Sequence, residues 1–217
     1  MERSGNMQQK EISKAVIKRL PTYLSYLRNL PEDAPPNISA TTLANALGMG
    51  EVQVRKDLAM VCSFGRPKVG YPRDRLADDI EQFLGYDNTN DAVIIGAGRL
   101  GQALLGYNGF EAYGLNIVAA FDANPVGNTI FGKPMMHIDQ LANYCRSHKV
   151  LMGIITVPAA YAQDVCDQLI ACGIKAIWNF APTHLEVPDH ILVQNENMAT
   201  SLAVLSMHLQ AQMKEKK

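Results

Sequence analysis

The chain lacks the features of a membrane or secreted protein. No apolar stretch approaches the length of about 20 residues that a bilayer-spanning helix needs, and the first residues, Met-Glu-Arg-Ser-Gly-Asn, lead into a charged segment rather than a signal sequence. Internal repeats and low-complexity segments are absent as well. We therefore expect a cytoplasmic protein without a membrane partner.

Cysteine is scarce, and the histidines form no catalytic pattern. The four cysteines, Cys62, Cys145, Cys166 and Cys172, have no Cys-x-x-Cys spacing and lie within apolar patterns. This favours reduced core thiols over disulfides or a metal site. The five histidines show no arrangement of a base with an orienting partner. The sequence thus predicts no metal site and no catalytic residue.

What the sequence does contain is a globular composition with unevenly distributed charge. The 217 residues are 47% hydrophobic and carry a formal net charge of −1, which suits one medium domain and one small domain. Residues 1–73 contain 11 Lys and Arg against 6 Asp and Glu, whereas residues 74–217 contain 9 against 15. The asymmetry favours a polyanionic partner for the N-terminal part, although scattered surface charge also produces part of such a difference.

The N-terminal part has the periodicity of a helix-turn-helix domain. Apolar residues recur at helical spacing over 12–27, where Pro21 is expected to kink or restart the helix. Ser39 can cap a second helix, which Gly48-Met49-Gly50 ends. A third helix over 51–60 follows after only this three-residue turn. Its inward residues are Val54, Leu58 and Val61, and its outward residues are Gln53, Arg55 and Lys56.

The segment 63–71 is expected to form a short basic hairpin. It combines two glycines and a proline with Arg66 and Lys68. A helix-turn-helix that is followed by such a hairpin is a winged helix. A further amphipathic helix near 76–84 and a linker over 85–90 complete this part.

A glycine-rich turn follows a short apolar run in the middle of the chain. After residues 92–95 come Gly96, Ala97, Gly98, Arg99, Leu100 and Gly101, a Gly-x-Gly-x-x-Gly turn. The first glycine of such a turn permits the tight bend, the second lets the backbone approach a pyrophosphate, and the third allows close helix–strand packing. Strand, turn and helix together predict dinucleotide binding. The alternative is a glycine-rich turn without a ligand.

Asp122 ends the next expected strand, about 20 residues beyond the last glycine. An acid at this distance is expected to bind a ribose 2′-hydroxyl. Because its charge would repel a 2′-phosphate, and residues 123–125 supply no arginine, NAD(H) is favoured over NADP(H). The alternative is that Asp122 only forms the turn at the end of the strand.

Strands and helices alternate through this part of the chain. Strands are expected over 92–96, 116–122, 150–156 and 174–180, with helices from 100, over 138–147 and over 160–172. Such alternation predicts an α/β domain with a parallel sheet and right-handed crossovers. Short extended pieces around 185–187 and 191–193 precede one long amphipathic helix over about 197–213.

Together these segments resemble the Rex family of redox-sensing transcriptional repressors over nearly the whole chain. The residues that carry the resemblance are 19–24, 54–58, 69–71, 96–101, 121–122, 156–159 and 179–182. Members of that family join an N-terminal winged helix to a Rossmann domain and exchange their last helix within a homodimer, and NADH lowers their affinity for DNA. The resemblance implies domains over 1–85, 86–196 and 197–217, NAD(H) as the ligand, and an inverted-repeat, A·T-rich operator.

The resemblance also implies which residues face DNA. Arg55 and Lys56 would lie on the recognition helix, beside Gln53, and Arg66 and Lys68 would lie in the wing near the minor groove. Arg and Lys bind guanine or phosphate, and an arginine suits the negative potential of a narrow A·T groove. Each is otherwise a solvated surface cation. The adjacent Asp57 is expected to be a salt-bridge partner within the helix.

On the nucleotide side, the resemblance places Tyr107 near the nicotinamide. It places Thr156, Val157 and Pro158 at the carboxyl edge of the sheet, where Rossmann ligands bind. Packing is the alternative role for each of these residues.

Two short segments, one in the wing and one at the start of the last helix, depart from the pattern of the family. The wing has Pro67 and Lys68 where the family commonly has Arg-Gly, so wing contacts are expected to be altered. Asn197 and Met198 stand where the family often has Asp followed by Phe or Leu. In the switch that the resemblance implies, that position exchanges an Arg19 partner for a Tyr107 partner, and a neutral amide makes weaker bonds there.

Two other function classes are alternatives to a redox-sensing repressor. An NAD-dependent dehydrogenase needs a substrate domain, for which no segment remains beside the winged helix and the last helix. A nucleotide-insensitive DNA-binding scaffold would not need Asp122 or the glycine turn, and this chain has both.

Overall fold

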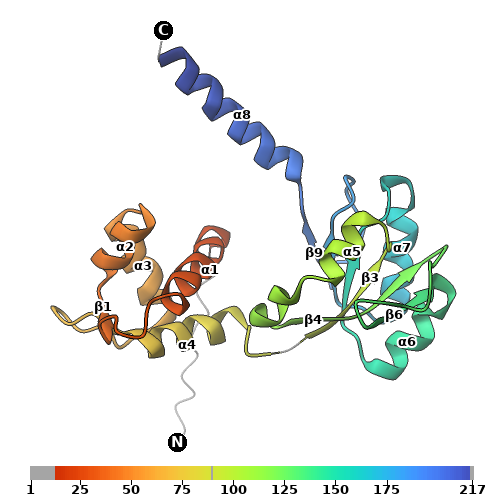
Figure 1. Cartoon of the computed structure of the whole chain (residues 1–217), viewed down its shortest axis with the longest axis horizontal. Coiled ribbons are helices and arrows are strands. Elements are labelled where there is room, and N and C mark those ends of the chain that lie inside the picture. The colour runs from red at the N-terminus through yellow and green to blue at the C-terminus, as the bar shows by residue number, and fades with distance from the viewer. Residues whose placement is uncertain (1–12, 89, 216–217) are drawn as a thin grey trace, which may run out of the picture. The chain divides into compact units, whose positions relative to one another are not determined.

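The structure, a computed structural model, describes residues 13–88 and 90–215 (Figure 1). It divides into two compact units, Met1–Asn88 and Thr89–Lys217. Ile12, the first residue of the expected apolar pattern, lies outside the described residues.

The first unit is a small helical domain. Its elements are α1 (Lys14–Arg28), β1 (Asn37–Ile38), α2 (Ala40–Leu47), α3 (Glu51–Val61), β2 (Tyr71–Pro72) and α4 (Arg73–Leu84). The two strands form one antiparallel pair. All four helices contribute fully buried side chains to a single core, among them Leu20, Leu43, Leu58 and Ile80. One shared core fixes the helices within this unit.

Local signals explain the helix-turn-helix. The Ser39 hydroxyl accepts a hydrogen bond from the Thr42 N–H at 2.9 Å and so caps α2. Gly48 follows α2 with a φ of +63°, a conformation that favours glycine. The expected turn between α2 and α3 is therefore confirmed.

The first helix is not interrupted at Pro21, contrary to the expected restart. Pro21 lies inside α1, which runs unbroken from Lys14 to Arg28. Proline removes one N–H donor from the helix. Leu20 and Tyr23, on either side of it, are completely buried, and their packing outweighs this local cost.

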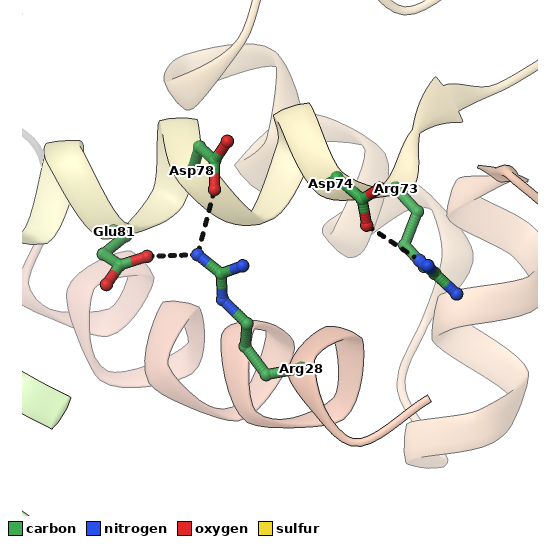
Figure 2. A network of polar contacts seen from close by, with 5 residues as sticks. All are labelled: Arg28, Arg73, Asp74, Asp78 and Glu81. Atoms are coloured by element: carbon green, nitrogen blue, oxygen red, sulfur yellow. Dashed lines mark hydrogen bonds and ion pairs between the residues drawn. The ribbon is translucent and has the colours of Figure 1, made fainter. Parts of the chain in front are cut away.

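Figure 2 shows how ion pairs join α1 to α4. Arg28 of α1 contacts Asp78 of α4 at 2.9 Å and also contacts Glu81. Within α4, Arg73 contacts Asp74 at 3.0 Å. These pairs lie at the surface, outside the apolar core.

The wing is a tight hairpin, as expected. The Arg66 N–H donates to the Gly70 carbonyl at 3.0 Å, and the Gly70 N–H donates to the Arg66 carbonyl at 2.9 Å. Lys68, at the tip, has a φ of +66°. A Cβ at Gly70 would lie 2.3 Å from the Ile38 carbonyl oxygen, so this position requires glycine.

The second unit is built on a seven-stranded sheet. Its strands are β3 (Asn90–Ile95), β4 (Leu115–Asp122), β5 (Thr129–Ile130), β6 (Lys133–His137), β7 (Met152–Ile155), β8 (Ala176–Asn179) and β9 (Leu192–Asn195). Its helices are α5 (Arg99–Leu105), α6 (Leu141–His148), α7 (Ala159–Ala171) and α8 (Met198–Glu215), with short 3-10 turns η1 (Asn108–Tyr113) and η2 (Ile138–Gln140). The strand order is β5-β6-β4-β3-β7-β8-β9, parallel except for the β5–β6 pair.

This order places the first strand of the unit, β3, at the centre. Counted from β3 and without β5, the order is the 3-2-1-4-5-6 order of a Rossmann fold. Val93 and Ile95 pack with buried residues of α6 and α7, whereas Ala92 and Ile94 pack with Leu105 of α5. The strand is thus buried on both faces, which explains its continuous apolar run.

The sequence predicts no element between residues 122 and 138, where the structure has the β5–β6 hairpin. Its turn holds Phe131 and Gly132 at φ values of +50° and +74°. Of the two extended pieces expected here, the one near 191–193 corresponds to β9 (Leu192–Asn195), which forms the last edge of the sheet, and residues 185–187 lie outside any strand.

The last helix, α8, has no buried face among its described side chains. Met198, Leu202, Leu205, Leu209 and Met213, which are its apolar line, are each between 58% and 68% exposed. No helix in the described part of the chain is both long and apolar enough to cross a membrane.

Candidate nucleotide cleft and DNA interface

Backbone geometry explains each glycine of the turn between β3 and α5. Gly96 has a φ of +101°, and a Cβ there would lie 2.9 Å from the Val157 side chain. A Cβ at Gly101 would lie 2.0 Å from the Gly96 carbonyl oxygen, so α5 can pack against the turn only with glycine there. Gly98 has open space where a side chain would stand, which leaves its backbone accessible to a ligand.

Asp122 is bonded to this turn. Its Oδ2 accepts a hydrogen bond from the Ala97 N–H at 2.7 Å, and its Oδ1 accepts one from the Asn124 N–H at 2.8 Å. The role as a turn former at the strand end is thus present. A carboxylate has about four acceptor positions, so Asp122 retains capacity for ribose hydroxyls.

Thr156 ties the end of β7 to the same turn. Its hydroxyl lies 2.7 Å from the Gly96 carbonyl oxygen and 3.1 Å from that of Ile95, and it donates to them. The packing role considered for Thr156 is therefore present, and it holds two neighbouring strand ends together where the strand order reverses.

A cleft of about 530 Å³ opens at this point. Of the predicted cofactor residues, those that line it are Gly96, Gly98, Asp122, Thr156, Val157 and Pro158. The turn residues Ala97, Arg99, Leu100 and Gly101 do not line it: the Ala97 N–H is bonded to Asp122, Gly101 is buried against Gly96, and Arg99 and Leu100 are exposed in the first turn of α5. The predictions missed Tyr161, Asp164 and Gln168 of α7, which also line the cleft. Their helical spacing after Pro158 was the available signal.

Tyr107 is not among the residues that line this cleft. Its ring is 54% exposed and meets Phe110 edge to face, with a centroid distance of 4.8 Å. Phe110 in turn contacts Trp178, which contacts Phe180. Tyr107 therefore begins a row of aromatic rings that reaches the end of β8, and its predicted contact with nicotinamide stays a prediction.

In the first unit, predicted DNA-binding residues gather at one hollow. Arg55 of α3 and Arg66 and Lys68 of the wing line a depression of about 510 Å³ beside the first residues of α2. No acidic residue is among those that line it. Arg55 also contacts Glu51, one helical turn away. The hollow is thus positively charged.

Gln53 and Lys56 do not line this hollow, but both are exposed on α3. Gln53 donates a hydrogen bond to Asp57 at 2.8 Å. The outward orientation predicted for both residues is therefore confirmed.

Asp57 is a salt-bridge partner, but its partner lies on another helix. Arg19 of α1 donates to both of its carboxylate oxygens, at 2.7 and 2.9 Å, and Tyr23 donates to it at 2.8 Å. Burial acts to raise the pKa of Asp57, but these hydrogen bonds and the one from Gln53 outweigh it and lower that pKa. Arg19, the predicted switch residue, is thus already paired within its own unit.

Asn197 has a local structural role. Its Oδ1 accepts a hydrogen bond from the Thr200 N–H at 3.2 Å, at the start of α8. Asn197 and Met198 line a hollow of about 660 Å³ with Phe180 and residues 181–184. Glu196, the residue before Asn197, accepts a hydrogen bond from the Trp178 indole N–H at 2.9 Å. A contact of Asn197 with Arg19 or Tyr107 stays a prediction.

The cysteines of the chain are single, mostly buried thiols. All four cysteines are free, and burial raises the pKa of Cys62, Cys145 and Cys166 to about 11. No group of three or more His, Cys, Asp or Glu side chains within residues 13–88 and 90–215 is placed to hold a metal ion.

Two family models match the chain. The model described as "Putative DNA-binding protein N-terminus" matches residues 11–59. The model described as "CoA binding domain" matches residues 87–183. They cover the helix-turn-helix and most of the Rossmann sheet respectively.

Curated relatives match over nearly the full length. A protein of Clostridium beijerinckii named redox-sensing transcriptional repressor Rex is 43% identical, over 90% of this chain and 94% of the relative. A protein of the same name from Treponema denticola is 40% identical, over 88% of this chain and 92% of the relative. These names are those of repressors and not of enzymes, as the sequence predicted.

Solved structures of a Rex-family repressor also match the chain. RSP, a Rex-family repressor, was solved in complex with β-NAD⁺ and operator DNA. That chain is 36% identical to this one with a TM-score of 0.87, and the match covers 96% of this chain and 97% of the other. RSP in complex with β-NADH matches with a TM-score of 0.83 and 35% identity, over 96% of this chain and all of the other. The chain belongs to the Rex family of redox-sensing transcriptional repressors.

Proposed function

We propose that this protein is a DNA-binding repressor that senses the NADH/NAD⁺ ratio and leaves its operator when NADH binds. The observation that carries the proposal is that one chain holds two separate binding features, one in each unit. The second unit has a cleft with the glycine turn and Asp122 at the point where the strand order reverses. The first unit has a hollow with three cations beside a recognition helix.

The cleft suits a dinucleotide whose ribose carries no extra phosphate. The exposed Gly98 backbone would receive the pyrophosphate, and the free acceptor positions of Asp122 would bind ribose hydroxyls. The charge of Asp122 disfavours a 2′-phosphate, as in NADP(H), and equally the ribose 3′-phosphate of coenzyme A. NAD(H) therefore fits these residues better than coenzyme A does.

Two DNA-binding units are needed for an inverted-repeat operator, so the active form is a homodimer. Exchange of α8 between subunits would cover its exposed apolar line. Recognition helices reach successive major grooves only when they lie about one helical turn, or a multiple of it, apart. NADH would change the distance between the two recognition helices. The cations of the wing would favour an A·T-rich minor groove. Such a repressor acts in the cytoplasm without a metal.

Preference for NADH has a simple physical source. The nicotinamide ring is a cation in NAD⁺ and neutral in NADH. Burial of the cation beside an apolar group, such as Met198 at the start of α8, costs more than burial of the neutral ring. The ligand controls DNA binding only if it binds the two conformations of the dimer with different affinity.

The direct test is a titration of the full-length protein on an inverted-repeat, A·T-rich duplex, with the NADH/NAD⁺ ratio varied at constant total nucleotide. The affinity for DNA should fall as the NADH fraction rises. An affinity that does not depend on the ratio would contradict redox sensing, and absence of sequence-specific binding at any ratio would contradict a repressor function.

A matched pair of variants tests the cleft. Asp122→Ala should weaken NADH binding by at least about 1 kcal/mol, because a hydrogen bond to a charged group contributes about 1.5–3 kcal/mol. Asp122→Asn keeps an acceptor for the Ala97 N–H, so it separates loss of charge from loss of turn geometry. DNA affinity without nucleotide is the control and should remain that of the wild type. Unchanged NADH affinity by calorimetry in both variants would remove Asp122 from the site.

A further inference from the structure

Three side chains from two helices converge on the buried carboxylate of Asp57. Its Oδ2 accepts hydrogen bonds from Arg19 Nε at 2.7 Å and Tyr23 Oη at 2.8 Å. Its Oδ1 accepts from Arg19 Nη2 at 2.9 Å and Gln53 Nε2 at 2.8 Å. These four bonds use about all the acceptor positions of a carboxylate. The side chain of Asp57 is 0% exposed, so its place between α1 and α3 is fixed.

This arrangement orients Gln53, which is exposed. A carboxylate only accepts hydrogen bonds, so the N–H side of the Gln53 amide must face Asp57. One N–H and the Oε1 of Gln53 remain without a hydrogen-bond partner among the described residues. The amide therefore presents one donor and one acceptor in a known order.

An adenine base offers the matching pair in the major groove. Its N7 accepts a hydrogen bond and its N6 amino group donates one, and glutamine can bind both at once. Gln53 lies in the first turn of α3, the second helix of the helix-turn-helix, and the first residues of a recognition helix are those that contact base edges. A side chain held before DNA arrives loses less conformational freedom on binding.

We propose that Asp57 is a positioning residue for base recognition, which holds Gln53 in the orientation that binds an adenine, with Arg19 and Tyr23 fixing Asp57 from α1. The inference rests on the proposed function, because it requires sequence-specific DNA binding. A hydrogen bond between residues four apart also stabilises a helix by itself. The test must therefore measure base preference rather than stability.

The experiment begins with the full-length protein and randomised duplex DNA, from which wild-type protein selects its preferred sequence. Affinity is then measured for that duplex and for duplexes with each adenine replaced in turn by 7-deazaadenine, which lacks the N7 acceptor. The variants are Gln53→Ala, Tyr23→Phe and Arg28→Ala. Tyr23→Phe removes one hydrogen bond to Asp57 and no group that faces DNA. Arg28→Ala removes two surface ion pairs of the same helix, with Asp78 and with Glu81 (Figure 2), and is the control for general destabilisation.

At one adenine of each half-site, 7-deazaadenine should weaken wild-type binding by up to about tenfold, because it removes one of the two hydrogen bonds of the bidentate contact. Gln53→Ala should be insensitive at that adenine, Tyr23→Phe should be partly insensitive there, and Arg28→Ala should behave as the wild type. The positioning proposal is overturned if Gln53→Ala keeps full sensitivity at every adenine, or if Tyr23→Phe changes no base preference. If the wild type selects no sequence, DNA recognition itself fails, which identifies the proposed function as the error.

Discussion

Among the described residues, each unit completely buries one carboxylate or amide side chain, and the two units satisfy that group in different ways. In the first unit it is Asp57, a charged group whose hydrogen bonds all come from side chains of α1 and α3. In the second unit it is Asn179, a neutral amide bonded to the Thr183 carbonyl, the Asn195 side chain and the Ala181 N–H. The contrast predicts that acid pH and loss of ion pairing destabilise the first unit through this buried carboxylate, whereas the buried amide of the second unit does not titrate and contributes equally at acid and neutral pH.

The largest effect is expected from Asp57→Ala, which should lower the free energy of unfolding of the first unit by about 3–5 kcal/mol, as removal of one partner from a buried ion pair does. It leaves the Arg19 guanidinium and the buried Tyr23 hydroxyl without their acceptor. The measurement is chemical unfolding followed by circular dichroism. Trp178, the one tryptophan of the chain, lies in the second unit, so its fluorescence transition should not move. A shift of both transitions together would contradict independent units.

Both acid and alkaline pH should weaken the cluster of Asp57, Arg19 and Tyr23. The pKa of Asp57 is lowered, so its contribution to stability is complete above the ordinary range near pH 4 and is lost as the pH falls through the lowered value. Burial and the hydrogen bond to Asp57 raise the pKa of Tyr23 to about 12. Its contribution is therefore complete below about pH 10 and is lost as the pH rises toward 12. Stability of the first unit should fall at both limits. Tyr23→Phe should remove the part of the alkaline loss that comes from Tyr23, and the part that comes from the buried Cys62 and Tyr71, whose pKa values are also raised, should remain.

Asn179→Ala should lower the free energy of unfolding of the second unit by less, about 1–3 kcal/mol. It leaves the Ala181 N–H and the other partners of Asn179 without a hydrogen bond, but it leaves no buried charge unpaired. The loss should appear in the Trp178 fluorescence transition and should be the same at acid and neutral pH. A strong dependence of this loss on pH would mean that a titratable group shares the site, and the contrast with Asp57 would fail.

The two buried groups also show what a sequence can predict. The cap at Ser39, the glycine turn at 96–101 and the strand before it depend on neighbouring residues, and the structure contains all three. The partner of Asp57 could not be assigned in this way, because Arg19 lies 38 residues away and reaches it only when α1 packs on α3. For the same reason, the contacts of Asn179 with residues near 195 were not foreseen. The β5–β6 hairpin could not be predicted either, because its turn holds Phe131 at a positive φ, and phenylalanine is not typical of that conformation.

The smallest effect is expected at the other arginine of α1 that joins two helices. The Arg28 side chain is 50% exposed, and those of its partners Asp78 and Glu81 are 66% and 32% exposed, so both pairs lie at the surface (Figure 2). Exposed ion pairs contribute about 0–1 kcal/mol, because water and salt screen the charges and two long side chains must be ordered. Arg28→Ala should therefore change the free energy of unfolding by no more than about 1 kcal/mol, and the change should vanish in high salt. The same circular dichroism measurement at low and high salt tests this. If Arg28→Ala lowers the free energy of unfolding as much as Asp57→Ala does, burial does not set the contribution of these ion pairs, and the contrast between the two arginines fails.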